Sequence, residues 1–243
     1  MTSKQVLISG GTSGIGRAIA LAFAAEGVQV LATGVSQAEV QAANVGRSTG
    51  PSYGSIRNEV LEVRSAEQVA RLVATLPRLD VLVNCAGVIR RGGVEHDPAV
   101  FAEVLDVNLT GTMRLCTAAR PLLKESRGCV LNTASMLSYF GSGVAPAYSA
   151  SKGGIAQLTK SLAIAWAADG IRVNAIAPGW IESPLTEPLF SDPVRRQAII
   201  DRTPLARWGQ PEDVAGAALF LCSSAATFIT GVILPVDGGY SIA

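Results

Sequence analysis

Hydrophobic and polar positions follow two alternating patterns along the chain. Short, almost wholly apolar runs are separated by longer stretches of Ala, Leu, Glu, Arg and Gln at helical spacing. Apolar runs of this length are typical of parallel strands that are covered on both faces. They predict strands at Gln5–Ser9, Val28–Thr33, Val60–Val63, Val81–Asn84, Cys129–Thr133, Arg172–Ile176 and Val232–Val236. The longer stretches predict helices at Gly16–Ala25, Glu67–Leu76, Phe101–Leu122, Ala147–Ala168 and Glu212–Leu221.

Alternation of strand and helix over the whole length predicts an α/β fold. We expect a single domain, residues 1–243, built as a Rossmann-type doubly wound parallel sheet with helices on both faces. Two segments depart from the pattern. Asn44–Ser55 is rich in Gly, Ser and Thr and predicts a loop or a shortened helix. Pro178–Pro193 is rich in proline, follows a strand and predicts a mobile flap over a site.

Composition narrows the class of protein. The chain is 49% hydrophobic and 16% charged, which provides for a large core. Its net charge of +1 gives no electrostatic footprint for nucleic acid or an anionic membrane. We expect neither an export signal nor a membrane span.

The four cysteines, Cys85, Cys116, Cys129 and Cys222, form no C-x-x-C pair and no metal-ligand cluster with His96, the single histidine. Buried free thiols in a reducing, cytoplasmic setting are therefore expected, with no metal. His96 is expected to have a surface or capping role.

A glycine-rich turn joins the first predicted strand to the first predicted helix. It reads Gly10-Gly11-Thr12-Ser13-Gly14-Ile15-Gly16. Glycines allow a sharp turn and a close approach to a pyrophosphate, and the helix N-terminus supplies N–H groups for the anion. The spacing is G-x-x-x-G-x-G instead of G-x-G-x-x-G. Taken alone, the turn could also be a tight connection without a ligand.

Further short motifs follow in a fixed order. They are Asn84-Cys85-Ala86-Gly87, Asn108 within Asp106-Val107-Asn108, Ser135, Tyr148-Ser149-Ala150-Ser151-Lys152, Pro178-Gly179 and Asp237-Gly238-Gly239. Each motif is weak by itself, but their order and spacing together are specific. With these motifs the chain resembles the classical short-chain dehydrogenase/reductase family over essentially its whole length.

The family's chemistry is reversible hydride transfer between nicotinamide and a secondary alcohol or ketone. A phenol titrates near about 10, and a neighbouring ammonium lowers that pKa. Residues four apart share a helix face, so Lys152 is expected beside Tyr148, which would act as the acid in reduction and the base in oxidation. The resemblance implies that Lys152 also binds the nicotinamide ribose, that Ser135 donates to the substrate oxygen and that Asn108 holds a water in a proton relay.

The resemblance also implies the cofactor-binding set. It comprises Gly10, Thr12, Ser13, Gly14, Ile15, Gly16, Gly34, Val35, Ser36, Glu62, Val63, Asn84, Ala86, Gly87, Tyr148, Lys152, Pro178, Gly179, Ile181 and Ser183. Gly34 stands where relatives that prefer NAD carry Asp, and Val35 stands where many that prefer NADP carry Arg. Ser13 replaces a further base of the NADP enzymes. Because a 2′-phosphate without a base would be poorly compensated, the sequence favours NAD over NADP.

Substrate selection in this family lies in the loop after the fifth strand and in the flap. Arg90-Arg91, Ser135-Met136-Leu137-Ser138 and Arg207-Trp208-Gly209 resemble the branch of 2-deoxy-gluconate and gluconate dehydrogenases. Arg90 or Arg91 could clamp a substrate carboxylate, with Met136 and Trp180 also contacting substrate; equally, both arginines could be solvated loop residues. A sugar acid or related polyol is the expected substrate.

Two other functions stay open. One is a 3-oxoacyl-[acyl-carrier-protein] reductase, which shares most of these motifs. The other is a cofactor-binding sensor without catalysis, although such proteins usually lose one of the residues matched here by Asn108, Ser135, Tyr148 and Lys152. The resemblance further implies a homodimer or homotetramer that uses the helices predicted at Phe101–Leu122 and Ala147–Ala168 and the terminal segment Val232–Ala243.

Overall fold

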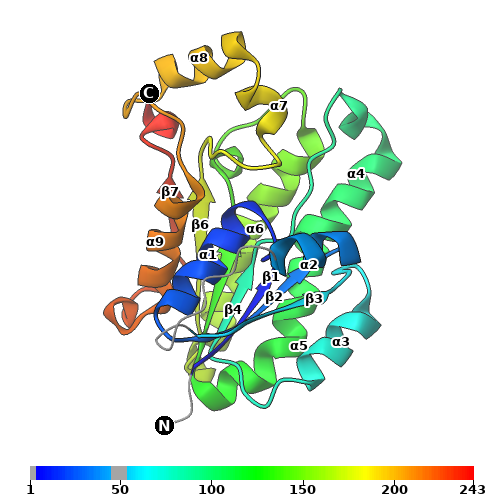
Figure 1. Ribbon diagram of the computed structural model, residues 1–243, viewed down its shortest axis with the longest axis vertical. Coiled ribbons are helices and arrows are strands. Elements are labelled where there is room, and N and C mark those ends of the chain that lie inside the picture. The colour runs from blue at the N-terminus through cyan, green and yellow to red at the C-terminus, as the bar shows by residue number, and fades with distance from the viewer. Residues whose placement is uncertain (1–3, 45–53) are drawn as a thin grey trace.

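A seven-stranded parallel sheet runs through the computed structural model, which describes residues 4–44 and 54–243 (Figure 1). The strands are β1 (Gln5–Ser9), β2 (Gln29–Gly34), β3 (Ile56–Val60), β4 (Val81–Asn84), β5 (Cys129–Thr133), β6 (Arg172–Pro178) and β7 (Ile233–Val236). Their order across the sheet is β3-β2-β1-β4-β5-β6-β7. The predicted doubly wound fold is confirmed.

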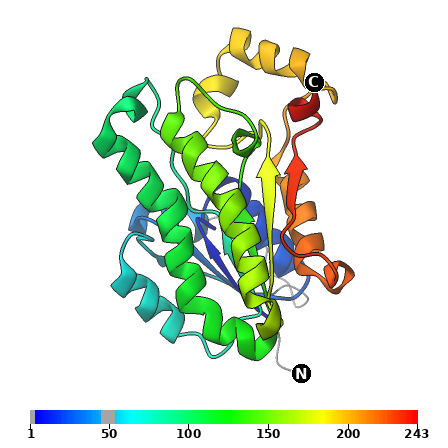
Figure 2. The same cartoon turned by 180° about the vertical axis from the view of Figure 1, so that it is seen from behind.

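Helices cover both faces of this sheet. They are α1 (Gly14–Ala25), α2 (Gln37–Asn44), α3 (Ala66–Ala74), α4 (Pro98–Leu105), α5 (Gly111–Ser126), α6 (Pro146–Trp166), α7 (Glu187–Phe190), α8 (Pro193–Arg202) and α9 (Pro211–Cys222). Seen from behind, α5 and α6 lie across the sheet in green and yellow-green (Figure 2). Short α7 and longer α8 stand above the carboxyl ends of the strands (Figure 1).

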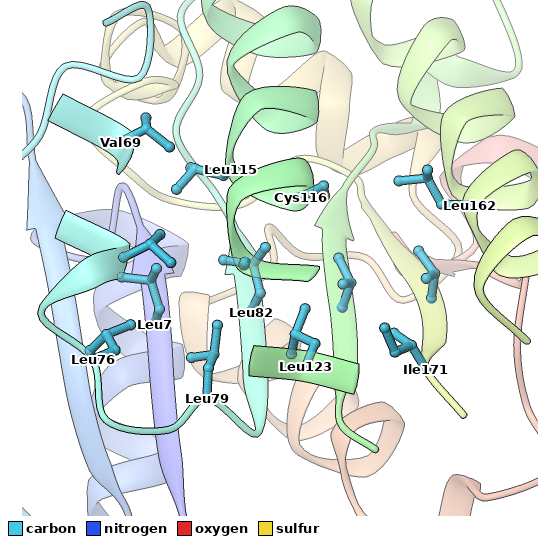
Figure 3. Close-up of a cluster of buried hydrophobic side chains, with 14 of the residues drawn as sticks. Leu7, Val69, Leu76, Leu79, Leu82, Leu115, Cys116, Leu123, Leu162 and Ile171 are labelled. Carbon is cyan, nitrogen blue, oxygen red and sulfur yellow. The ribbon is translucent and has the colours of Figure 1, made fainter. Parts of the chain in front are cut away.

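Two apolar cores result from the alternation of side chains along each strand. On β1, Leu7 points to the core shared with α3, α5 and α6, while Val6 and Ile8 point to the core shared with α1 and α9. Figure 3 shows the first core, where leucines of the strands and helices interdigitate. Complete burial of a leucine contributes roughly 1.5–3 kcal/mol, so this double burial holds the sheet between its helices.

One strand was predicted with the wrong bounds and shares only Val60 with the observed strand. The apolar pattern predicted Val60–Val63, whereas β3 spans Ile56–Val60 and contains Arg57, Asn58 and Glu59. β3 lies at the edge of the sheet and is only partly buried, so its polar residues are tolerated. Leu61 and Val63 are buried beyond the strand, where they complete the first core. The other predicted strands overlap the observed ones.

The helix predictions were incomplete. Phe101–Leu122 was predicted as one helix, but α4 and α5 are separated by a π-helical turn at Asp106–Thr110. The sequence pattern also missed α2, α7 and α8. Half of the residues in α2 and in α8 are polar, and α7 has only 4 residues within the predicted flap. The predicted loop Asn44–Ser55 lies mostly outside the described residues, apart from Asn44, Gly54 and Ser55.

The sheet order fixes where a ligand can bind. Chain connections run in opposite directions on the two sides of β1, which pairs with β2 on one side and β4 on the other. A crevice forms at such a switch point, outside the carboxyl ends of the strands. Across the described residues, every helix is too short or too polar to cross a membrane. All four cysteines have free thiols, and those of Cys116, Cys129 and Cys222 are buried.

Candidate active site

The glycine-rich turn lies at the switch point, between the end of β1 at Ser9 and the start of α1 at Gly14. Gly10 has φ of +66°, and a Cβ there would lie 2.7 Å from the Ala86 nitrogen. A Cβ at Gly16 would collide with the carbonyl oxygen of Gly10. Only glycine therefore permits this tight path of the backbone.

The first turn of α1 begins at the same switch point, at Gly14. Ser13 precedes the helix, and within the described residues no side chain caps its first N–H groups. Such uncapped groups and the positive end of the helix dipole suit an anion. A Cβ at Gly14 would lie 3.4 Å from the Cβ of Ser183, so the flap crosses the glycine-rich turn.

The Asn84–Gly87 segment closes the opposite side of the crevice. The Cys85 nitrogen donates to the carbonyl oxygen of Ser9 at 3.0 Å, and the Ala86 nitrogen donates to Ser9 Oγ at 3.4 Å. Asn84 is buried, and its amide donates to Asn132 Oδ1 at 2.9 Å. The Asn84 side chain thus ties β4 to β5, and a cofactor contact through it stays a prediction.

Tyr148 and Lys152 share one face of α6, as their spacing predicts. Lys152 Nζ lies 5.5 Å from the centre of the Tyr148 ring. The ammonium donates to the carbonyl oxygen of Thr133, the last residue of β5, at 2.6 Å. Only 4% of Lys152 is exposed, so its position is fixed by packing as well as by this hydrogen bond.

Burial dominates the electrostatics of this pair. It raises the pKa of Tyr148 to about 12, while a hydrogen bond with Ser135 and the charge of Arg91 act in the opposite direction. Burial also lowers the pKa of Lys152 to about 8. In the protein alone, the pKa of Tyr148 therefore does not fall as the sequence argument predicted, because loss of water around the phenol outweighs the hydrogen bond with Ser135 and the charge of Arg91.

Ser135 follows β5 and faces the Tyr148 hydroxyl. Its side chain starts a short 3₁₀ turn, Met136–Ser138, by accepting from the Leu137 nitrogen at 3.2 Å. The Ser138 hydroxyl supports this turn, because it accepts from the Ser135 nitrogen at 3.3 Å and donates to the Lys152 carbonyl oxygen at 2.7 Å. The turn therefore holds Ser135 against the helix that carries Tyr148.

Asn108 lies in the π-helical turn and is almost fully buried, with 1% of its surface exposed. Its amide pairs with the Val88 backbone in both directions, accepting at 2.8 Å and donating at 2.9 Å. It also donates to Ser151 Oγ at 3.0 Å. A Cβ at Gly87 would lie 3.4 Å from Asn108 Oδ1 and 3.7 Å from Lys152 Nζ. Asn108 thus joins the loop after β4 to α6.

Glu95 is a site residue that the sequence analysis missed. Its side chain is fully buried and accepts from the Tyr148 nitrogen at 2.9 Å and from the Arg90 nitrogen at 2.8 Å. Its carboxylate thus satisfies an N–H group in the first turn of α6. The charge of Glu95 contributes to the raised pKa of Tyr148. No motif signals this contact, because 53 residues separate the two partners.

The two candidate arginines point in different directions. Arg90 forms an ion pair with Glu103 of α4 at 2.6 Å. Arg91 donates to the Leu185 carbonyl oxygen of the flap at 2.7 Å, and its charge acts on Tyr148. Arg195 of α8 lies close enough to act on Arg91 in turn. Arg195 itself forms an ion pair with Asp192 at 3.5 Å, so its charge is partly balanced.

The flap is anchored internally. Thr186 Oγ1 donates to the Ile181 carbonyl oxygen at 2.5 Å and accepts from the Ser183 nitrogen at 3.0 Å. Ile181 is buried, and Gly179 donates to the Val236 carbonyl oxygen at 3.0 Å, directly after Pro178. Thr186 is a second residue that the sequence analysis missed. It limits the freedom of the predicted flap.

Two candidate substrate residues pack in an aromatic cluster under α8. Met136 is buried against Ile199, Trp208 and Tyr240. The Trp180 ring lies 5.7 Å from that of Trp208, and its Nε1 is buried with no hydrogen-bond partner in the described parts of the chain. Contacts of Met136 and Trp180 with substrate stay predictions.

The remaining cofactor candidates lie along the carboxyl edge of the sheet. Thr12 follows β1, Gly34 ends β2 and Ser36 caps α2 by accepting from the Glu39 nitrogen at 3.2 Å. Glu62 accepts from Arg64 at 2.8 Å, and this contact lowers the pKa of Glu62. The others are Ile15, which is half-buried, Val35, which is exposed, and Val63, which is buried.

These features fit a dinucleotide. The crevice offers a tight glycine turn that a Cβ would block, an uncapped helix start for a pyrophosphate, and a phenol beside a buried amine. His96 belongs to the surface, where Nε2 lies 3.1 Å from the Gly143 carbonyl oxygen, in line with its predicted role.

Comparison with known proteins agrees with this geometry. The family described as enoyl-(acyl carrier protein) reductase matches residues 10–241. The chain belongs to the short-chain dehydrogenase/reductase family. Within it, the chain is an NAD(P)-dependent oxidoreductase that acts on CH–OH groups.

The similar proteins include dehydrogenases named for gluconate derivatives and a reductase named for oxoacyl groups. The chain is 38% identical to a 2-dehydro-3-deoxy-D-gluconate 5-dehydrogenase of Bacillus subtilis, covering 99% of this chain and 95% of the relative. It is 36% identical to a 3-oxoacyl-[acyl-carrier-protein] reductase of Thermotoga maritima, covering 100% and 99%. A structure from Agrobacterium tumefaciens, provisionally named a 2-deoxy-D-gluconate 3-dehydrogenase and holding NADP, is 38% identical with a TM-score of 0.89, covering 100% and 98%.

Proposed function

We propose that this enzyme oxidises a secondary hydroxyl of a sugar acid, or reduces the corresponding ketone. The observation that carries the proposal is Arg91, whose guanidinium donates to the Leu185 carbonyl oxygen of the flap at 2.7 Å and whose charge acts on Tyr148. An anionic substrate would be drawn to this place. The sugar-acid relative from Bacillus subtilis supports the same substrate class.

In the proposed reaction, nicotinamide supplies or accepts the hydride when it is bound. Tyr148 donates its phenolic proton to the substrate oxygen during ketone reduction and takes it back during alcohol oxidation. Lys152, held by Thr133, favours the phenolate whenever it is charged. Ser135 donates to the substrate oxygen and stabilises the charge that develops there.

Asn108 has a positioning role in this proposal. Its amide is occupied by Val88 and Ser151, and these contacts fix the π-helical turn beside α6. The carbonyl oxygen of Asn108 already accepts from Thr112 Oγ1 at 2.9 Å. A water held by this residue, as the family resemblance implies, would therefore share an acceptor that a side chain already uses.

Arg91 is the proposed carboxylate ligand, in preference to Arg90. The guanidinium of Arg90 forms an ion pair with Glu103, whereas the guanidinium of Arg91 donates one hydrogen bond to the backbone carbonyl of Leu185. A planar guanidinium retains further donors for a substrate carboxylate. Replacement of Arg91 should therefore weaken substrate binding more than replacement of Arg90.

Cofactor preference, location and assembly complete the proposal. We infer NAD as the preferred cofactor, in a cytoplasmic enzyme.

A homodimer or homotetramer is supported by exposed apolar side chains on the family's interface helices, with Met113 of α5 38% and Ile164 of α6 81% exposed. A monomeric mass by light scattering would contradict that assembly.

A substrate screen tests the proposed activity. Sugar acids, polyols and oxoacyl thioesters are offered with each cofactor while nicotinamide absorbance is followed. We expect turnover of a sugar acid, and a KM raised about tenfold or more by Arg91→Met but little by Arg90→Met, because a charge-assisted hydrogen bond contributes about 1.5–3 kcal/mol. Turnover confined to oxoacyl thioesters, or equal effects of both variants on KM, would contradict the proposal.

A further inference from the structure

A carboxylate occupies the space that a side chain at the end of β2 would fill. Gly34 ends the strand, and a Cβ there would lie 2.8 Å from Glu39 Oε2 and 2.5 Å from Thr12 Oγ1. Glu39 belongs to α2 and is five positions further along the chain than Gly34. The strand therefore lacks its own acid, but an acid from the following helix reaches the same place.

The backbone and side chains around Glu39 hold it there. Its Oε2 accepts from the Val35 nitrogen at 3.0 Å and lies 3.5 Å from Thr12 Oγ1. The Glu39 nitrogen donates to Ser36 Oγ at 3.2 Å, which fixes the first turn of α2. Contacts on both sides thus direct the carboxylate toward the junction of β1 and β2.

This junction is where an adenosine ribose binds in a doubly wound sheet. β1 and β2 pair in parallel with Ser9 opposite Thr33, so Thr12 follows the end of β1 close to Gly34, the last residue of β2. In such folds an acid near this point accepts a hydrogen bond from the ribose 2′-hydroxyl of NAD. Glu39 is an exposed residue, so part of its side chain faces solvent beside this junction.

We propose that Glu39 is the residue that selects NAD over NADP, through a hydrogen bond from the ribose 2′-hydroxyl to its carboxylate. The proposal rests on the preference for NAD that is inferred under the proposed function, and it identifies the residue that decides this preference. A 2′-phosphate would replace a hydrogen-bond donor by a dianion next to this carboxylate. Like charges at such a distance repel, so NADP binds less well.

Binding measurements on the protein without substrate test this assignment. Dissociation constants for NAD⁺ and NADP⁺ are obtained from quenching of tryptophan fluorescence for the wild type, Glu39→Gln and Glu39→Ala. The matched control is Glu67→Gln, which removes an acid from the first turn of α3, at an exposed position paired only with Arg71 among the contacts described. Circular dichroism verifies that each variant is folded.

We expect the wild type to bind NAD⁺ more tightly than NADP⁺. Both Glu39 variants should weaken NAD⁺ binding about tenfold, the loss expected for a charge-assisted hydrogen bond, and should bind NADP⁺ as tightly as the wild type or more tightly. Glu67→Gln should change neither constant. An unchanged ratio of the two constants in the Glu39 variants would overturn the assignment. If the wild type binds neither nucleotide, the proposed function fails instead.

Discussion

The buried amine of Lys152 is the residue-scale feature with the clearest physical consequence. Lysine is rarely buried because removal of water disfavours its charged form. Burial lowers the pKa of Lys152 to about 8, and its one described hydrogen bond goes to the Thr133 carbonyl oxygen. The protein alone therefore maintains this amine at a cost in stability whenever it is charged.

Stability should depend on pH through this residue. Below about pH 8, Lys152 is charged in the folded protein and the cost of burying this charge is fully present. Between about pH 8 and 10.5, the folded protein releases the Lys152 proton while the unfolded chain retains it. The free energy of unfolding of the wild type should therefore rise across that window relative to Lys152→Met, by up to about 3 kcal/mol. Urea denaturation of both proteins at several pH values measures the difference. A constant difference would contradict the lowered pKa.

At this scale, sequence motifs predicted part of the site. Tyr148 and Lys152 were expected side by side from their spacing, and Ser135 and Asn108 were named from the family resemblance. The structure brings the four together, with Ser135 after β5, Asn108 in the π-helical turn and the other two on α6. Glu95 could not be named, because a carboxylate that caps a helix from a remote loop leaves no local pattern.

The π-helical turn is the element that most affects the site. A continuous α-helix over residues 98–126 would rotate Asn108 away from its present direction, since a π-turn inserts one extra residue. The turn instead directs the amide of Asn108 to both backbone groups of Val88. π-turns occur frequently at functional sites, which agrees with this placement.

Asn108→Ala should destabilise the fold by about 1–3 kcal/mol, because it leaves the part-buried N–H and C=O groups of Val88 without their partner. Asn58→Ala on β3 is the matched control. The Asn58 amide makes an exposed hydrogen bond to Asn44 at 2.9 Å, so its loss should cost less than about 0.5 kcal/mol. Chemical denaturation measures both values, and equal losses would show that Asn108 does not brace this turn.

Element type was predictable where burial is complete. Interior strands such as β1 and β4 are apolar on both faces and were predicted at the correct positions. The polar edge strand β3 and the polar helices α2 and α8 were not, because their residues face solvent on one side. Glu39 lies on the missed helix α2. The sequence analysis therefore noted that Gly34 lacks an acidic side chain but did not name Glu39 as the acid beside it.

At the scale of the whole molecule, the site is a property of the sheet order. The glycine-rich turn follows β1, Gly34 ends β2, Gly87 follows β4, Ser135 follows β5 and Pro178 ends β6. Parallel strands bring these points to one edge, although the residues are spread over more than half of the chain. Helix α6 then carries Tyr148 and Lys152 across the same edge. The motifs at the carboxyl ends of the strands therefore predict both the fold and the position of the site.

The central claim is that this assembled crevice performs hydride chemistry with Tyr148 as its acid and base. Tyr148→Phe keeps the ring beside Lys152 but removes the transferable proton. With a substrate found by the screen, kcat should fall at least about 100-fold, since a general acid or base contributes about 10²–10⁴. The dissociation constant of the cofactor, measured by fluorescence quenching, should stay within about threefold. Turnover at the wild-type rate in Tyr148→Phe would contradict the account.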